Sequence, residues 1–426
     1  MSSPICELLL MPALDEKASG TLETPALHEP TEIRPAHVWL MSFSVGVIVG
    51  NIYYIQPLLS LIASAFRISV AQVGAIAMAT QLGVALGMLV FVPLGDTLER
   101  RSLIVRLLLF AAICLAFVAC AKSTIWLGIA CFGVGIAGST VHVIVPFAAH
   151  LAPPSKRGTV VGSVMAGLLF GILLARTFSG FVGQVFGWRC VYWIACGLML
   201  ALAVLIRYLL PDSKPTLKLT WPQLMSSAFR LVREQPVLRE AAMLGAVFFA
   251  AFSAFWTTLI FFLQTPPYHY GSAAAGLFGL VGASGAAVAP FVGRIADRYG
   301  ARQNVLAALV LTLVSFVVMY AWGTNLVGLA VGVVLMDVGV QAGHISNQTR
   351  IYGLLPEARS RLNMVYMTSY FTAGAIGSSA SSLAWQHYGW AGVCSLGGGL
   401  AVIGLVVFVL CGSAGARAEG ADALAR

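Results

Sequence analysis

Between two long apolar runs in the second half of the chain lies the charged stretch Gly293-Arg294-Ile295-Ala296-Asp297-Arg298-Tyr299-Gly300-Ala301-Arg302. The first half has a degraded copy at the matching place, Val92-Pro93-Leu94-Gly95-Asp96-Thr97-Leu98-Glu99-Arg100-Arg101. A charged, glycine-bearing turn at equivalent positions of two very hydrophobic halves indicates a duplicated membrane bundle. Such a duplication is typical of a transporter, whose halves must move relative to each other.

The composition also indicates a membrane protein. Hydrophobic residues make up 59% of the chain and charged residues 10%, and the mean hydropathy is +0.89. A soluble domain has a far more polar balance. The apolar runs are about 20 residues long, the length a helix needs to cross a bilayer. Helices are expected because open strands would leave backbone groups unpaired in lipid.

Twelve apolar runs are candidate membrane-spanning helices. They lie near 38–62, 72–94, 103–120, 125–148, 159–183 and 189–210, and near 240–264, 272–294, 303–322, 325–346, 362–384 and 390–411. Only the gap at 211–239 is long enough to be a linker. We therefore expect an all-α integral membrane fold of two pseudo-symmetric six-helix bundles, at 38–210 and 240–411, joined by a linker at 211–239.

The basic residues predict the orientation of the chain. Most of the 25 Lys and Arg fall in alternate gaps between spans, and such residues are retained on the cytoplasmic side. Both tails, 1–37 and 412–426, are therefore expected to be cytoplasmic, and the polar first tail to be disordered. This asymmetry accounts for the net charge of +9, so no nucleic acid partner is expected.

The sequence has no recognisable motif for catalysis or for cofactor binding. The eight cysteines have no metal-ligand spacing, and neither a Gly-rich phosphate loop nor a nucleophile motif occurs. We therefore expect no enzyme activity, no cofactor and no metal. The linker has an amphipathic pattern after a capping box at Thr220 and Gln223, which fits a helix on the inner membrane surface or a solvated linker helix.

The duplication extends well beyond the charged loops. A shift of 202 residues pairs Gly74 with Gly276, His142 with His344, Arg157 with Arg359 and Gly187-Trp188 with Gly389-Trp390. A repeat with an even number of spans keeps its orientation, so the halves are parallel repeats related by an axis along the membrane normal.

With these features the chain resembles a twelve-helix member of the major facilitator superfamily, from about residue 38 to residue 411. That superfamily has a loop motif G-x-L-A-D-R-x-G-R-R between helices 2 and 3, with a weaker echo between helices 8 and 9. Here the second copy is the better preserved. The resemblance implies a cytoplasmic latch for the outward-facing state, built from Asp96, Arg100, Arg101, Gly293, Asp297, Arg298, Gly300 and Arg302. The alternative is that these charges only anchor the loops on the cytoplasmic side.

Two further segments are similar to the drug and sugar efflux branch of the superfamily, Asn51–Leu59 and Gly167–Gly180. Antiporters have a Gly-rich motif in helix 5, G-x-x-x-G-P-x-x-G-G, of which Gly167 and Gly171 remain while the Pro is absent. The pair also fits simple helix packing. The Arg expected in helix 4 of many proton antiporters is replaced by Cys131. The resemblance implies a monomer in the bacterial cytoplasmic (inner) membrane.

Two charged residues lie well inside the expected spans, Asp337 and Arg176. Each costs about 2.5 to 3.5 kcal/mol on insertion scales, so each should face protein or water. Their depths in the membrane differ by roughly 5 to 10 Å, within reach of an Arg side chain. We therefore hypothesise that they interact across the two halves.

Polar residues extend from Asp337 along one face of the same span: Gln341, His344 and Gln348 follow at helical spacing, and Asn347 lies beside them. Such a stripe either lines a water-filled cavity and exchanges protons at Asp337, His344 and the repeat partner His142, or forms a structural network between helices.

Aromatic and small polar residues indicate where a solute could bind. Ser253 and Trp256 lie in a Phe-rich span, and Asn51, Tyr54 and Gln56 lie in the first span. Together with Gln341, Asn347 and Gln348 they are the candidate substrate cavity. The aromatic rings suit an amphipathic organic solute or a sugar, or they face lipid.

The leading hypothesis is a secondary active transporter that exports a small organic solute in exchange for protons by alternating access. Proton symport or facilitated uptake is the alternative within transport. A transporter-like receptor or scaffold is the alternative from another class.

Overall fold

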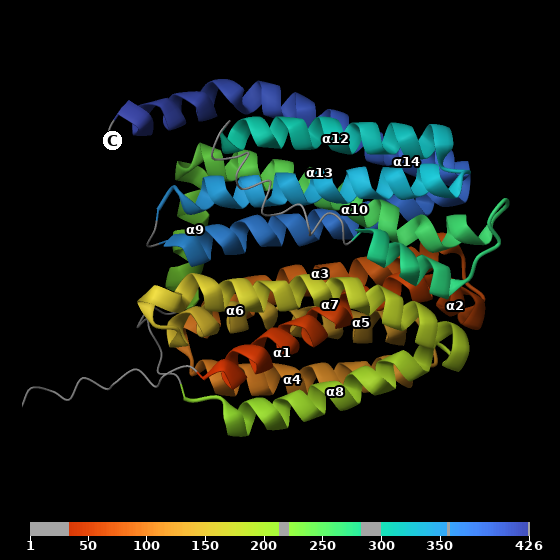
Figure 1. Cartoon of the computed structure of the whole chain (residues 1–426), viewed down its shortest axis with the longest axis horizontal. Helices are drawn as coiled ribbons and strands as arrows, with labels where there is room; N and C mark the ends of the chain where they lie inside the picture. Colours follow the sequence, from red (N-terminus) through yellow and green to blue (C-terminus); the bar gives the residue numbers. More distant parts are fainter. Residues whose placement is uncertain (1–33, 213–220, 283–299, 356–357, 425–426) are drawn as a thin grey trace, which may run out of the picture.

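The computed structural model describes residues 34–212, 221–282, 300–355 and 358–424, without the side chains of Asp96, Pro154 and 412–424. Every regular element in these ranges is helical (Figure 1). This is the expected result for so apolar a chain, because a helix satisfies its own backbone polar groups in lipid.

The first half contains two spans in which the regular α-helix is interrupted. The span expected at 38–62 divides at Tyr54, where the ring of Pro57 excludes a regular helical bond to the preceding turn. The span expected at 125–148 divides at Ser139 and Thr140. The N–H and the hydroxyl of Ser139 both donate to Ile136 O, and those of Thr140 both donate to Ala137 O. The elements are α1 (Pro35–Tyr53), α2 (Ile55–Phe66), α3 (Val70–Thr97), α4 (Arg100–Ala119), α5 (Thr124–Gly138), α6 (Val141–Leu151), a 3-10 turn (Pro154–Lys156), α7 (Arg157–Phe186) and α8 (Trp188–Leu209).

The second half repeats the turn that precedes the last span of the first. Gly389 has a φ of 59° inside the long α14, and its repeat partner Gly187 has a φ of 85° between α7 and α8. Positive φ favours glycine, so each half places a sharp turn here. The elements are α9 (Trp221–Glu234), α10 (Pro236–Gln264), the helix Ser272–Gly282, α12 (Ala301–Trp322), α13 (Leu326–Tyr352) and α14 (Arg359–Leu424).

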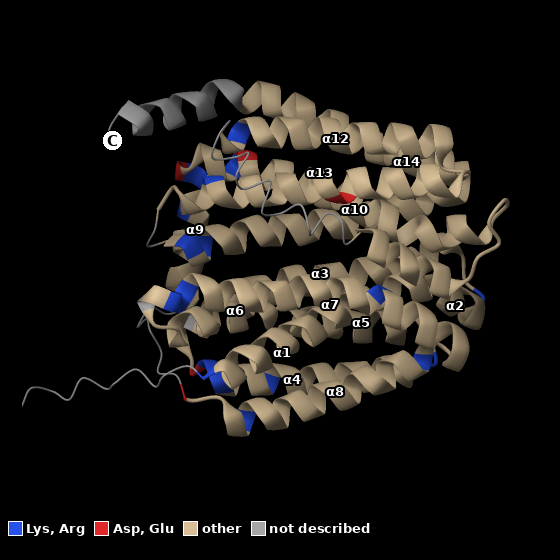
Figure 2. Cartoon of the chain, in the orientation of Figure 1, with Lys and Arg blue, Asp and Glu red and all other residues tan. Residues whose placement is uncertain are grey.

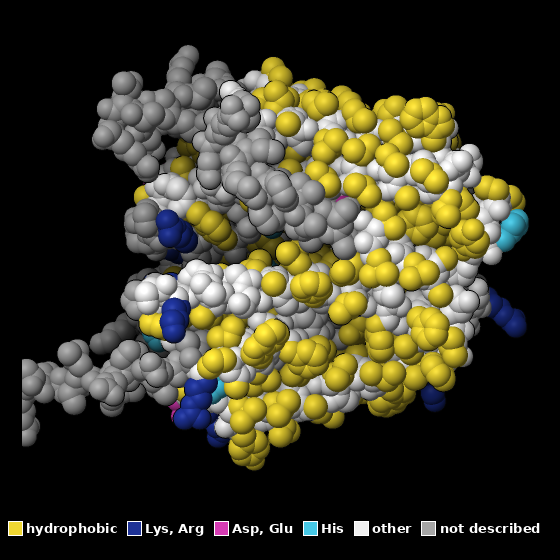
Figure 3. All heavy atoms as spheres, viewed as in Figure 1, with side chains coloured by type: hydrophobic (Ala, Val, Ile, Leu, Met, Phe, Trp, Pro, Cys, Tyr) yellow, Lys and Arg dark blue, Asp and Glu magenta, His cyan; other side chains and the backbone are white. Residues whose placement is uncertain are grey.

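The twelve expected spans can be traced in these helices. Within the described ranges, ten segments are long and apolar enough to cross a membrane, and one of them, Arg359–Cys411, holds the last two expected spans. The helix Ser272–Gly282 covers the start of the span expected at 272–294, and the remainder lies outside the described residues. Large apolar side chains cover much of the outer surface (Figure 3), as on a surface that faces lipid.

The first helix begins, and the last helix ends, at residues other than the expected boundaries of the two tails. The first helix begins at Pro35, slightly before residue 38, and residues 1–33 lie outside the described part. The expected boundary at 411 is not a helix end, because the backbone of α14 stays helical to Leu424.

Within each half, elements distant in sequence pack side by side. α1 packs on α7, α3 on α5 and α4 on α8, while α10 and α12 both pack on α14 (Figure 1). The halves meet where α3 packs on α14 and α2 on α10. This arrangement brings the central spans of both halves to one interface.

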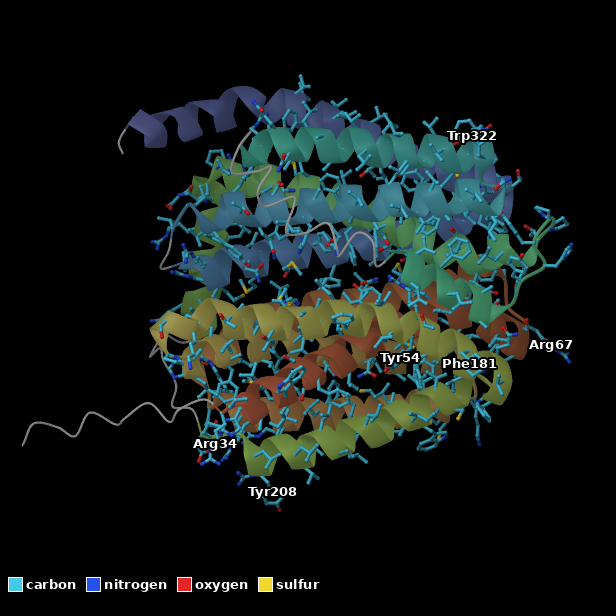
Figure 4. All side chains as sticks on the ribbon, in the orientation of Figure 1. Arg34, Tyr54, Arg67, Phe181, Tyr208 and Trp322 are labelled. Carbon is cyan, nitrogen blue, oxygen red and sulfur yellow. The ribbon has the colours of Figure 1, made fainter. Side chains whose placement is uncertain are left out.

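The two ends of the bundle differ in charge. We call the end near Arg34 and Tyr208 the basic end, and the end near Arg67 and Trp322 the opposite end (Figure 4). Most of the Lys and Arg drawn in Figure 2 lie at the basic end, as the gaps in the sequence predict. The surface is also hollowed between the halves at the basic end (Figure 3).

The linker helix α9 lies at the basic end. Its residues Leu224, Ala228 and Leu231 are buried, and the helix packs on α3, α10 and α14. The expected amphipathic helix is therefore present, but its apolar face is covered by protein rather than free to enter lipid. Thr220 of the expected capping box lies outside the described residues.

Candidate functional site

Arg176 on α7 is a buried guanidinium held mainly by aromatic rings. Its Nε donates to Gln56 Oε1 of α2 at 2.7 Å, and its Cζ lies 4.0 Å from the ring centroid of Trp256 on α10 and 4.9 Å from that of Tyr53 on α1. Aromatic faces attract a cation, most strongly where water is excluded. The contact with Trp256 therefore joins the two halves of the chain.

Asp337 on α13 is buried close to this guanidinium. A Cβ on Gly282 would collide with Asp337 Oδ2, and a Cβ on Gly279 would lie 3.0 Å from Arg176 Cβ. Both charges therefore lie against the glycine-bearing helix Ser272–Gly282, where the missing side chains leave room for them. Trp256 also borders Gly282, so its indole lies beside both charges.

Arg176 and Asp337 interact electrostatically across the two halves. Arg176 Nη2 and Asp337 Oδ1 are nevertheless both buried without a hydrogen-bond partner among the described residues. The proximity that the sequence suggested is thus present, without a hydrogen-bonded salt bridge. Arg176 Nη2 could therefore donate a hydrogen bond to a water or a solute, and Asp337 Oδ1 could accept a proton or a hydrogen bond.

The polar stripe of α13 continues toward the basic end along neighbouring helices. His344 Nδ1 lies 3.1 Å from Tyr366 Oη of α14, and Gln348 Nε2 donates to Asn363 Oδ1 at 3.3 Å. Asn347 is fully buried, whereas Gln341 is partly exposed. The stripe therefore combines contacts between helices with groups that remain accessible.

The repeat-related histidines come from different halves and lie close enough to interact electrostatically. His142 lies on α6 and His344 on α13, and the two interact electrostatically. The ring of His344 also lies 4.9 Å from that of Tyr370. The duplication thus places two titratable side chains near the interface, one from each half.

The residues expected to line a substrate cavity separate into two groups. Gln56 and Trp256 lie with Arg176 at the interface. Asn51 instead donates to Met199 Sδ at 3.3 Å inside the first half, and Tyr54 packs on Phe178. Tyr54 is labelled in Figure 4.

Ser253 also lies away from the charges. A Cβ on Gly374 of α14 would lie 2.9 Å from Ser253 Oγ, so this hydroxyl faces the contact of α10 with α14. Position along a span did not reveal this, because neighbouring residues of a helix point in different directions.

Aromatic rings from several helices gather around the charges. Tyr53 and Phe252 place their rings near Arg176, and Phe249 stacks on Tyr370 with ring centroids 4.1 Å apart. The aromatic rings of α10 are largely buried within the protein, which excludes lipid as their main neighbour. Their helical spacing was visible in the sequence, but the side of the helix facing the partner half was not.

The loop motif can be followed in part. Arg100 Nε donates to Gly95 O at 2.9 Å, and Glu99 caps α4 by accepting from Arg101 N and Ser102 N. Gly293, Asp297 and Arg298 lie outside the described residues, as does the side chain of Asp96. Gly300 precedes α12 with a φ of 87°, a conformation that favours glycine.

The motif arginines anchor the last helix of each half. Arg101 Nη1 donates to Leu210 O at 2.9 Å, and Arg302 Nη2 donates to Phe408 O at 2.8 Å. Leu210 is the C-cap of α8, where exposed carbonyls favour a cationic donor, whereas Phe408 lies within α14. The two copies of the motif therefore serve a common structural purpose.

Glu240 on α10 is a buried acid that the sequence did not reveal. Arg350 Nη2 lies 2.7 Å from its Oε2, and Arg302 Nε lies 3.3 Å from its Oε1. Glu240 opens a span, where a charge usually reaches water, so nothing in the sequence predicted its burial. Its partners come from α12 and α13, which makes it a link between three helices.

The fold agrees with the comparisons with known proteins. The family model described as Major Facilitator Superfamily matches residues 39–303 and 267–422. The chain belongs to the Major Facilitator Superfamily. It is an integral membrane transporter, and the superfamily implies a small solute as its substrate.

Relatives of this Major Facilitator Superfamily chain are also described as transporters. It is 43% identical to "Uncharacterized transporter YgaY" of Escherichia coli O157:H7, over 88% of this chain and 96% of that protein. It is 34% identical to "Probable transporter SCO4007" of Streptomyces coelicolor, over 86% of this chain and 85% of that protein. Among solved structures, the nucleoside transporter NupG matches with a TM-score of 0.69 at 15% identity, over 88% of this chain and 98% of that chain.

Proposed function

We propose that this transporter exports a small organic solute in exchange for protons, by alternating access between two six-helix halves. The single observation behind the proposal is the meeting of Asp337 and Arg176, from different halves, at a buried interface. Charged residues at membrane depth are costly and usually lie on a substrate or ion pathway.

The two halves proposed to move are residues 38–210 and 240–411, joined by 211–239. We place the basic end in the cytoplasm, with both termini, because most of the Lys and Arg drawn in Figure 2 lie there. The membrane is then the bacterial inner membrane, and the monomer contains the whole pathway. Under this orientation the hollow at the basic end faces the cytoplasm.

Coupling is proposed to depend on the charge of Asp337. An ionised Asp337 attracts Arg176 across the interface, and protonation removes that attraction, since the interaction of two charges is strong in a poorly polar environment. Proton binding thus weakens the contact between the halves. We propose that further residues bind the proton or the solute on its path toward the basic end. These are His142, His344, Gln341, Asn347 and Gln348.

Efflux of an organic solute is supported by the surroundings of the charges. Aromatic rings with a few polar groups, among them Gln56 and Trp256, suit an amphipathic solute. A relative from Pasteurella multocida, 25% identical over 87% of this chain and 91% of that protein, is described as "Probable sugar efflux transporter".

The decisive experiment is Asp337→Asn in proteoliposomes, after a screen of cells with and without the protein has identified an exported compound. We expect the variant to fold but to lose acceleration of solute flux by an imposed pH gradient, by at least about tenfold. Asp212→Asn is the control, because Asp212 is an acid at the surface that pairs with Arg101. Unchanged dependence on the pH gradient in Asp337→Asn would exclude the proposed coupling role.

The direction of flux separates antiport from the alternatives. Solute movement against the direction of proton flow indicates antiport, movement with it indicates symport, and indifference to the gradient indicates facilitated transport.

A further inference from the structure

The helix Ser272–Gly282 of the second half receives its N-terminal cap from the first half. Ala273 N donates to Gln184 Oε1 of α7 at 2.8 Å. Gly271, which precedes the helix, has no side chain that accepts a hydrogen bond. The first N–H groups of a helix lack partners within it, so an acceptor at this place stabilises the helix.

The repeat-related contact is built differently. The first turn of α3 is capped from within the same half by Ser69 and Gln72, in a capping box. Gln386, which a shift of 202 residues pairs with Gln184, has an exposed side chain on α14, as Gln184 has on α7, so the difference between the copies lies in the capping box of α3. The cap between the halves is therefore a feature of one copy only.

The cap lies at the end of a close contact that begins at the buried charges. Thr177 Oγ1 donates to Gly276 O at 3.1 Å, and a Cβ on Gly180 would collide with Ser272 O. A Cβ on Gly271 would lie 2.7 Å from Gln184 Oε1. Arg176, Thr177, Gly180 and Gln184 thus form one face of α7, from the site to the opposite end; Phe181 on the same turn is labelled in Figure 4.

We propose that Gln184 is a positioning residue of the transport cycle, which holds the opposite end closed by capping the helix Ser272–Gly282 across the interface. The proposal rests on alternating access as proposed above. When the halves separate at the opposite end, this helix loses its cap, whereas α3 keeps its own. Gln184 therefore adds a free-energy difference between the two states without touching the solute.

The test measures the conformation of the full chain in nanodiscs rather than transport. Spin labels replace Arg67 and Trp322, which lie at the opposite end in different halves (Figure 4), after the native cysteines have been replaced by Ser. For Gln184→Ala we expect the ratio of open to closed opposite end to rise about fivefold, which is about 1 kcal/mol at roughly 1.4 kcal/mol per tenfold change.

Two further variants separate capping from general damage. Gln184→Glu keeps an acceptor oxygen and adds a negative charge at a helix N-terminus, so the closed state should persist. Gln386→Ala removes the repeat-related amide and should leave the distance distribution as in the parent. The proposal is overturned if Gln184→Ala leaves the distribution unmoved, if Gln386→Ala has the same effect, or if Gln184→Glu behaves like Gln184→Ala.

This result is independent of proton coupling. A shift in Gln184→Ala together with unchanged pH dependence in Asp337→Asn would retain the capping role and reject proton coupling. The reverse pattern would reject the capping role alone.

Discussion

At the scale of single residues, Arg176 is stabilised in the membrane by rings and an amide. Its guanidinium lies over Trp256 and donates to Gln56, and its interaction with Asp337 is electrostatic, without a hydrogen bond between the two. A planar guanidinium can stack and donate at the same time, whereas an ammonium cannot. The identity of the cation should therefore matter as much as its charge.

Arg176→Lys tests this point. We expect solute flux in proteoliposomes to fall at least about tenfold with the protein still folded, because the ammonium loses the stacked contact with Trp256. Arg189→Lys is a matched control, since Arg189 lies 4.2 Å from the ring centroid of Trp188 at the opposite end, away from the interface. Equal losses in the two variants, or none in Arg176→Lys, would contradict the role given to stacking.

At the scale of elements, the contact of α7 with the helix Ser272–Gly282 is set by glycine. A Cβ on Gly276 would lie 2.6 Å from Arg176 O, a backbone atom that cannot move without the helix. Small residues are what allow helix backbones to approach so closely in membranes. The two elements must therefore separate if this space is filled.

We predict that Gly276→Val opens the opposite end. The added side chain should push α7 and the helix Ser272–Gly282 apart, so that the open state becomes the major one in the distance measurement between Arg67 and Trp322 labels. Gly197→Val is the control, because nothing lies within 4 Å of a Cβ at Gly197. If both variants keep the parent distribution, the close contact is not what holds this end closed.

The number and the positions of the helices could be predicted from the sequence. The length of each apolar run and the charged residues in the gaps between runs decide both. The interruptions at Tyr54 and at Ser139 could not be located, because Pro57 acts on the preceding turn and the Ser139 hydroxyl disturbs a helix only when it bonds to a carbonyl. For the site, charge at membrane depth revealed Asp337 and Arg176. The rings around them depend on helix rotation, which a single sequence does not give.

At the scale of the whole molecule, the two halves share the contact of a motif arginine with the last helix but differ in the acid that pairs with this arginine. Arg101 and Arg302 both hold the last helix of their half. Arg302 also pairs with Glu240, of which 2% of the side chain is exposed, whereas the partner of Arg101 is Asp212, of which 73% is exposed. A pair with a buried partner is costly to break, whereas a surface pair contributes little.

We therefore predict that Arg302→Ala destabilises the protein more than Arg101→Ala. Removing Arg302 takes one donor from a buried carboxylate, which should lower the free energy of unfolding by about 1 to 3 kcal/mol. For Arg101→Ala the loss should be below about 1 kcal/mol, because water can replace the guanidinium at Asp212. The comparison is made by thermal unfolding of the two variants in the same detergent.

The two copies of the loop motif should also differ in their importance as a cytoplasmic latch. Its better copy lies in the second half, so replacement of Asp297 or Arg298 should reduce transport more than replacement of Thr97. Glu99 caps α4 by accepting from Arg101 N and Ser102 N, so its replacement should lower the free energy of unfolding. Equal losses of stability and of transport in Arg101→Ala and Arg302→Ala would contradict this asymmetry. The two copies of the motif would then contribute equally to the latch, whether or not the partner carboxylate is buried.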